Sequence, residues 1–214
     1  MAVVFAACAS AWAGETGMQG RFSESGLDAW ESKSFAGETD YRLVTVDGMP
    51  VVRAQSEGAA SALVYRGRVD LKQTPFLNWS WRKLQGIDPG DESARSGDDF
   101  VARVYVIIDG GLLFWKSRAL NYVWSFQHRV GEAWDNPFAG PAARMLALRD
   151  ASHGEGVWYH ERRDVASDFR DFRGEQVRYI DGVAIMTDSD NSASRALAEY
   201  GDIWFSAAPG AVKQ

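Results

Sequence analysis

The stretch Val183-Ala-Ile-Met-Thr-Asp-Ser-Asp-Asn191 decides the fold that we expect for this chain of 214 residues. It begins with an apolar run that is typical of a buried β-strand, and it ends in an acidic turn. A second strand-like segment, Ile203-Trp-Phe205, follows shortly afterwards. A strand, a polar turn and another strand indicate a β-rich protein, and the rest of the chain repeats this pattern.

Apolar and polar residues alternate through short segments that Gly, Pro, Asp and Ser separate. We predict strands over residues 41–46, 51–55, 61–65, 75–82, 100–109, 120–126, 144–149, 157–162, 176–188 and 203–206. The pair Asp47-Gly48 predicts a hairpin between the first two, because Gly tolerates the positive φ of a tight turn. One short helix is expected over residues 164–172. This arrangement predicts an all-β, antiparallel β-sandwich of jelly-roll type with at most one short helix.

The first thirteen residues carry no charge and end in Ala11-Trp12-Ala13, which resembles a signal-peptide cleavage site. We therefore expect a leader over residues 1–13, a single domain over residues 14–214, and a periplasmic or secreted protein. An alternative is that Cys8 becomes the lipidated end of a lipoprotein. Cys8 is the only cysteine of the chain, so a mature protein without the leader forms no disulfide.

Composition narrows the possible partners. The net charge of −6 excludes nucleic acid, because binding a polyanion needs clustered Lys and Arg. Beyond the leader, no apolar run is long enough to predict a membrane span. Nine tryptophans are a strong signal, but aromatic residues build both β-cores and platforms for sugar rings.

The strand expected over residues 100–109 has one apolar face and one mixed face. Arg103 and Tyr105 fall on the mixed face, where they could line a polar concavity. In the preceding strand, Trp79 and Trp81 share a face and Arg82 lies on the other. The two tryptophans either form a stacking platform or pack in the core; if they pack in the core, we expect Arg82 to neighbour Arg103.

Acidic residues suggest a metal site. Asp188 and Asp190 alternate in the manner that Ca²⁺ favours, and Asp98 and Asp99 could add ligands from another loop. With Asp188 as position one, however, Ala193 stands where an EF-hand needs glycine. The alternative is a turn in which the Asp and Asn side chains bond their own backbone.

Motifs of catalysis are absent. The three histidines are widely spaced, and the sequence has no nucleophile elbow or phosphate loop. Paired carboxylates could support a glycosidase, but Glu161, Asp164 and Asp168 are candidates only by elimination. We therefore predict no catalytic residues.

Several motifs together resemble a family of uncharacterised exported bacterial proteins, DUF3047. They are the Trp79-x-Trp81 strand, the Gly97-Asp98-Asp99 strand entry, the Tyr122-Val-Trp124 strand and the opening stretch that leads to Tyr200-Gly-Asp-Ile203. The resemblance covers about residues 22–205. It implies a secreted or periplasmic β-sandwich similar to galactose-binding-like and carbohydrate-binding modules, with no catalytic residues to carry over.

We therefore expect a non-catalytic module that binds carbohydrate or another small polar, hydroxyl-rich or anionic ligand. The expected ligand-binding residues are Arg82, Arg103, Tyr105, Trp124 and Trp134. The expected metal ligands, for Ca²⁺, are Asp98, Asp99, Asp188 and Asp190. Two alternatives stay open: a structural or protein-interaction module with a partner in the cell envelope, and a polysaccharide hydrolase or lyase.

Overall fold

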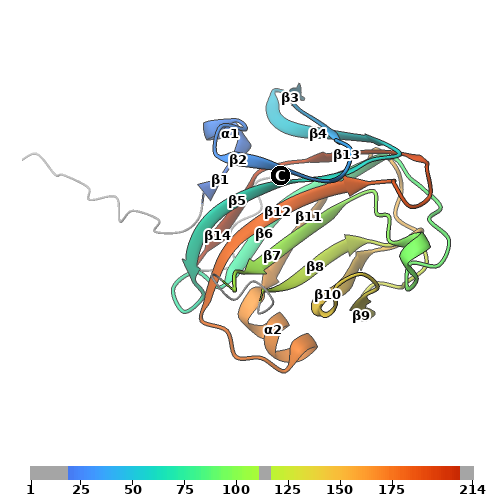
Figure 1. Cartoon of the computed structure of the whole chain (residues 1–214). Coiled ribbons are helices and arrows are strands. Elements are labelled where there is room, and N and C mark those ends of the chain that lie inside the picture. Colours follow the sequence, from blue (N-terminus) through green and yellow to red (C-terminus); the bar gives the residue numbers. More distant parts are fainter. Residues whose placement is uncertain (1–18, 111–116, 208–214) are drawn as a thin grey trace, which may run out of the picture.

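A computed structural model describes residues 19–110 and 117–207 of the chain. The expected leader, residues 1–13, lies outside the described residues. The described chain folds into two seven-stranded β-sheets packed face to face. We call the sheet that contains β6 sheet A and the sheet that contains β12 sheet B, which lies in front in Figure 1. Apolar residues that alternate along the strands fill the space between the sheets.

Sheet A is centred on β6 (Phe76–Gln85). Along one edge of β6 lies β11 (Tyr159–Asp164), and along the other lie β14 (Ile203–Ser206) and β13 (Arg195–Tyr200) one after the other. The remaining strands are β1 (Gln19–Gly20), which pairs with β14, and then β4 (Met49–Glu57) and β3 (Asp40–Val46) beyond β13.

Sheet B runs in the order β2, β5, β12, β7, β8, β10, β9. The strands are β2 (Trp30–Ala36), β5 (Ala60–Asp70), β12 (Tyr179–Asp188), β7 (Arg103–Ile108), β8 (Arg118–Trp124), β10 (Gly140–Arg149) and β9 (Ala133–Asn136). Neighbouring strands are antiparallel except β8 and β10, which are parallel. The parallel pair arises because the chain forms the outer strand β9 first and then turns back to place β10 between β9 and β8.

The centre of the core is aromatic. Trp79 and Trp81 point between the sheets and are almost fully buried. Trp79 stacks on Tyr122 at 5.2 Å between ring centroids, and Trp81 lies 6.0 Å from Trp124. Each ring buries about 150–250 Å², which at ~25 cal/mol per Å² stabilises the fold by several kcal/mol. The interpretation of Trp79 and Trp81 as a surface platform is therefore wrong, and the alternative of core packing is confirmed.

Two α-helices, α1 (Phe22–Ser25) and α2 (Val165–Arg173), and one 3₁₀ turn, Arg95–Gly97, accompany the sheets in the described part of the chain. The second helix begins where expected, because the Asp164 carboxylate accepts a hydrogen bond from the Ser167 N–H and caps the helix. The predicted β-sandwich with one short helix is confirmed, since only α2 exceeds a single turn. No helix among residues 19–110 and 117–207 has the length and hydropathy of a membrane span.

Candidate functional site

The outer face of sheet B carries a pocket of about 340 Å³. Its floor is made of small and aliphatic side chains from three adjacent strands: Ala62 and Val64 from β5, Ala184 from β12 and Ile107 from β7. The pairing of β5 with β12 and of β12 with β7 brings these residues together on one face. Small side chains in the middle of the face leave room for a ligand between longer side chains at the sides.

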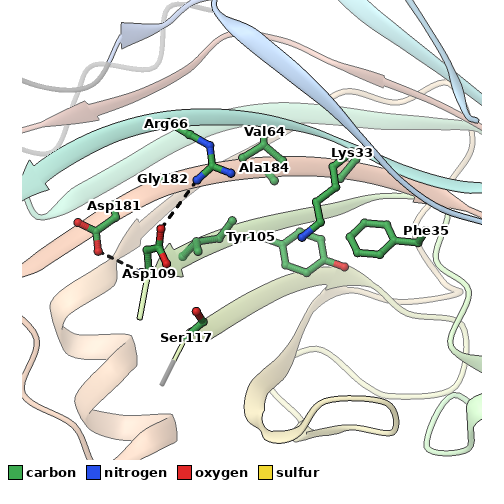
Figure 2. Close-up of a pocket in the computed structure, with 12 residues that line it drawn as sticks. Lys33, Phe35, Val64, Arg66, Tyr105, Asp109, Ser117, Asp181, Gly182 and Ala184 are labelled. Atoms are coloured by element: carbon green, nitrogen blue, oxygen red, sulfur yellow. Dashed lines mark hydrogen bonds and ion pairs between the residues drawn. The ribbon is translucent and has the colours of Figure 1, made fainter. Parts of the chain in front are cut away.

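The two ends of the pocket differ chemically, as Figure 2 shows. Lys33, Phe35 and Tyr105 lie at one end, and Arg66, Asp109 and Asp181 lie at the other. Phe35 is 60% exposed, so its ring is open to a ligand. The pocket therefore offers aromatic surface at one end and hydrogen-bonding groups at the other.

The polar end is held together by its own contacts. The Arg66 guanidinium lies 3.2 Å from a Glu31 oxygen and 3.9 Å from an Asp109 oxygen. The Asp109 N–H donates to the Asp181 carboxylate at 3.0 Å. Charges of opposite sign therefore lie beside one another at this end of the pocket.

Arg103 lies beside Tyr105 on the outer face of sheet B and supports the pocket through it. It is only 2% exposed and forms ion pairs with Asp188 and Asp98. Its guanidinium also donates to the Tyr105 hydroxyl at 3.3 Å and lies 4.4 Å from the centroid of the Phe100 ring. Arg103 does not line the pocket and is too buried to touch a ligand there; its contacts instead fix Tyr105, which does line it.

The surroundings of Arg103 are unusually acidic. Burial raises the pKa of Asp188 to about 8, and the nearby charges of Asp98 and Asp99 add to the rise while Arg103 opposes it. Burial disfavours the charge of Arg103, but Asp188 and Asp98 outweigh it and raise the pKa of the guanidinium. Several carboxyl groups thus share one buried cation, so this group of carboxyls retains a proton that isolated carboxyl groups would release.

Three of the four expected metal ligands come together. Asp99, Asp188 and Asp190 each place an oxygen within 4.8 Å of the others, so by proximity they could hold a metal ion. Asp98 instead accepts hydrogen bonds from the Asn136 side-chain amide at 2.9 and 3.0 Å.

Two of the three carboxylates have other partners. Both oxygens of Asp188 bind Arg103, and those of Asp99 accept from the backbone N–H groups of Asn191 and Ser192 at 3.1 and 2.6 Å. The second set of bonds fixes the turn that follows β12, but the carboxylate comes from Asp99 in another loop and not from the turn itself, as the alternative of a self-bonded Asp and Asn turn had it. A Ca²⁺ ion would have to displace these bonds and approach the positive charge of Arg103, so the donor set fits the ion poorly.

The two expected tryptophans have different positions. Trp124 is fully buried in the core, where its indole N–H donates to the Asp150 carbonyl, so it offers no surface to a ligand. Trp134 in β9 lies on the outer face of sheet B, but beyond the pocket and stacked on His128 at 3.7 Å between ring centroids.

Arg82 lies on the other side of the molecule. It belongs to β6 in sheet A, whereas Arg103 belongs to β7 in sheet B, so the expectation that the two are neighbours is wrong. The chain crosses from one sheet to the other between these strands. Arg82 instead shares the buried carboxylate of Glu199 with Arg53, with N–O distances of 2.6 Å to each.

Most of the pocket was not predicted from the sequence. Of the expected residues only Tyr105 lines it, and Lys33, Phe35, Arg66, Asp109 and Asp181 were missed. The alternation of charged and aromatic residues in Glu31–Phe35 was a signal for a strand with a functional outer face. That signal is weak, because the strand that contains this segment has a single buried apolar residue, Trp30.

These features define a jelly-roll β-sandwich with a ligand-sized hollow on the outer face of one sheet. The chain belongs to the family described as "Protein of unknown function (DUF3047)", whose profile matches residues 28–204. No curated protein matches the sequence.

Solved structures that are similar to this chain include carbohydrate-binding modules and a glycoside hydrolase domain. The family 11 carbohydrate-binding module of the cellulosomal cellulase Lic26A-Cel5E of Clostridium thermocellum has a TM-score of 0.50 at 10% identity, over 92% of this chain and 98% of the module. The module CBM27-1 of Caldicellulosiruptor saccharolyticus, in complex with mannohexaose, has a TM-score of 0.40 at 9% identity, over 91% of this chain and 98% of that one.

The glycoside hydrolase domain of Endo-D from Streptococcus pneumoniae R6 has a TM-score of 0.44 at 9% identity, over 85% of this chain. This chain spans only 22% of the length of that one. The likeness to the family 11 module supports the jelly-roll fold that the sequence predicts.

Proposed function

We propose that this protein is a non-catalytic binding module whose pocket on the outer face of sheet B holds a saccharide. The observation that carries the proposal is the pocket itself: about 340 Å³, with an aliphatic floor, two aromatic rings at one end and polar side chains at the other. Ligand sites typically have this size and this combination of apolar lining with a few polar groups.

Each part of the pocket suits one part of a sugar. The apolar face of a pyranose ring packs on an aromatic ring, here Tyr105 or the exposed Phe35. Its hydroxyl groups need donors and acceptors, which Arg66, Asp109 and Asp181 supply at the polar end. The likeness in fold to a carbohydrate-binding module supports this interpretation of the pocket.

The test is calorimetric titration of the protein with a panel of neutral and acidic oligosaccharides. We expect saturable binding of at least one of them, and about a tenfold loss of affinity in Tyr105→Ala, because an aromatic contact contributes about 0.5–1.5 kcal/mol beyond its buried area. The matched control is Tyr179→Ala, which removes a tyrosine that stacks on Arg68 and Arg178 outside the pocket. If no saccharide binds, the proposal fails and the role of an envelope interaction module takes its place.

A second candidate, hydrolysis of polysaccharide, rests on Asp109 and Asp181, which lie together at the polar end of the pocket. A glycosidase needs two carboxyl groups that face the bond to be cleaved. The discriminating assay measures new reducing ends during long incubation with each polysaccharide that binds. Release that disappears in Asp181→Asn would favour the hydrolase; binding without release supports the module.

For the acidic triad we propose a structural role, the fastening of the turn after β12, in place of a calcium site. A thermal-shift titration with CaCl₂ tests this, since a ligand that binds only the folded state raises the melting temperature. We expect no saturable rise. A rise that is lost in Asp190→Asn would instead assign Ca²⁺ to Asp99, Asp188 and Asp190.

The proposal also includes export to the periplasm or the outside, where envelope and extracellular polysaccharides occur. The apolar, uncharged residues 1–13 support it. Fractionation of cells that express the full chain tests it, together with sequencing of the mature N-terminus.

A further inference from the structure

The charges around the pocket are unevenly compensated. Arg66 has two acidic partners, Glu31 and Asp109. Lys33, by contrast, has no ion-pair partner among the residues that the structure describes, and its ammonium group contacts the Phe35 ring at 5.2 Å from the centroid. Figure 2 shows the Lys33 side chain extending from β2 into the aromatic end of the pocket.

An uncompensated cation beside two rings discriminates between ligands. A neutral sugar that covers the aromatic end removes water from Lys33 and replaces it only with weak hydroxyl acceptors, which costs free energy. A carboxylate restores the lost hydration with a charge-assisted hydrogen bond, which is about twice as strong as a neutral one. The ligand that recovers most of the desolvation cost is therefore one with an acidic group at this end.

The rest of the molecule gives no general attraction for anions. The net charge of the chain is −6, so long-range electrostatics disfavour an acidic ligand. A preference for acidic saccharides therefore has to come from the local charge of Lys33, because the net charge of the molecule opposes it. This makes the preference sensitive to a single side chain.

We propose that the pocket selects saccharides that carry carboxylate groups, and that Lys33 is the residue that determines this specificity. The inference rests on the proposed function, because it names the ligand class of the same pocket. The sugar ring packs against Tyr105 or Phe35, and its carboxylate binds the Lys33 ammonium group.

The test compares two ligands that differ only in the acidic group: mannohexaose and the hexamer of mannuronic acid. Calorimetry on the wild-type protein is expected to give about tenfold tighter binding of the acidic hexamer, since a hydrogen bond to a charged group is worth roughly one power of ten in affinity. Lys33→Met should remove this difference by weakening binding of the acidic hexamer, and it should not weaken binding of mannohexaose, because it also removes the cost of desolvating the ammonium group. The control is Lys72→Met, which changes an exposed lysine in the turn after β5.

Two results would overturn the inference while the proposed function stands. One is tight, Tyr105-dependent binding of a neutral saccharide with no preference for the acidic hexamer. The other is an equal loss for both ligands in Lys33→Met. Absence of binding by every saccharide in the panel would instead overturn the proposed function, and the inference with it.

Discussion

At the scale of single residues, Arg103 connects the pocket to the buried carboxylates of Asp98 and Asp188. Its ion pairs with Asp188 and Asp98 are almost completely buried, and its bond to the Tyr105 hydroxyl fixes the ring that lines the pocket. A buried ion pair stabilises a fold little more than well-packed apolar residues of similar volume would. Removing only one partner, however, leaves a buried charge without compensation.

Arg103→Met should therefore destabilise the fold by about 3–5 kcal/mol, the cost of breaking a buried ion pair. The matched control is Arg66→Met, which breaks an ion pair whose side chains are 64% and 69% exposed, and which should cost less than about 1 kcal/mol of folding stability. Urea denaturation of both variants gives the two values. Equal, small losses would contradict the assigned role of Arg103.

Asp188 should make stability depend on pH. Its pKa is raised to about 8 in the folded state, against ~4 for an exposed Asp. Between these values the folded protein holds a proton that the unfolded chain has released, so this contribution to stability is present at low pH and is lost as pH rises through the folded pKa.

We expect the free energy of unfolding of the wild type to fall relative to that of Asp188→Asn between about pH 5 and pH 8. The variant carries no titratable group at this position, so the difference between the two curves isolates Asp188. Parallel curves would show that the carboxyl is ionised over this whole range.

Strand alternation explains what could be predicted at this scale. Because successive side chains point to opposite faces, the sequence placed Arg103 and Tyr105 on a different face from Val104 and Val106, and the structure agrees. The same rule does not say which strands are neighbours, so it could not show that Arg82 belongs to the other sheet.

At the scale of elements, the two residues of the turn between β3 and β4 determine the conformation of that hairpin. Asp47 and Gly48 both have positive φ, 51° and 80°, as the predicted tight turn requires. Nothing lies within 4 Å of a Cβ added at Gly48, so backbone conformation alone opposes a larger residue there.

Gly48→Ala should therefore destabilise the protein by about 1 kcal/mol, the cost of placing an L-residue in the left-handed region. Gly154→Ala is the control, because a Cβ there makes only an ordinary 3.7 Å contact with the Val157 side chain. Thermal unfolding of the two variants measures the difference. A larger loss from the Gly154 change would contradict the argument.

The elements that the sequence did not predict have weak strand signals. In β13 the buried positions include Ala196 and Ala198, and alanine has a low preference for strands. In β9 the strand has only four residues and ends directly before Pro137. Strand β13 forms because partners far away in sequence, β4 and β6, supply the hydrogen bonds and the packing surface, whereas β9 pairs with β10, which follows it directly.

At the scale of the whole molecule, the sandwich could be predicted but the pocket could not. Short alternating segments with turn residues between them are enough to indicate two packed sheets. The pocket depends on the order β2, β5, β12, β7, which joins residues 30–36, 60–70, 179–188 and 103–108. Strands that are so far apart in the sequence carry no local pattern that identifies their partners, so a single sequence does not reveal the pairing.

We infer that the ligand binds to the outer face of sheet B. The most direct test is chemical-shift mapping on the ¹⁵N-labelled protein during titration with the tightest-binding oligosaccharide of the panel. We predict that the amide signals that move will cluster on β2, β5, β12 and β7, around Lys33, Val64, Tyr105 and Ala184. Shifts confined to sheet A, around Arg53 and Arg82, would contradict the account.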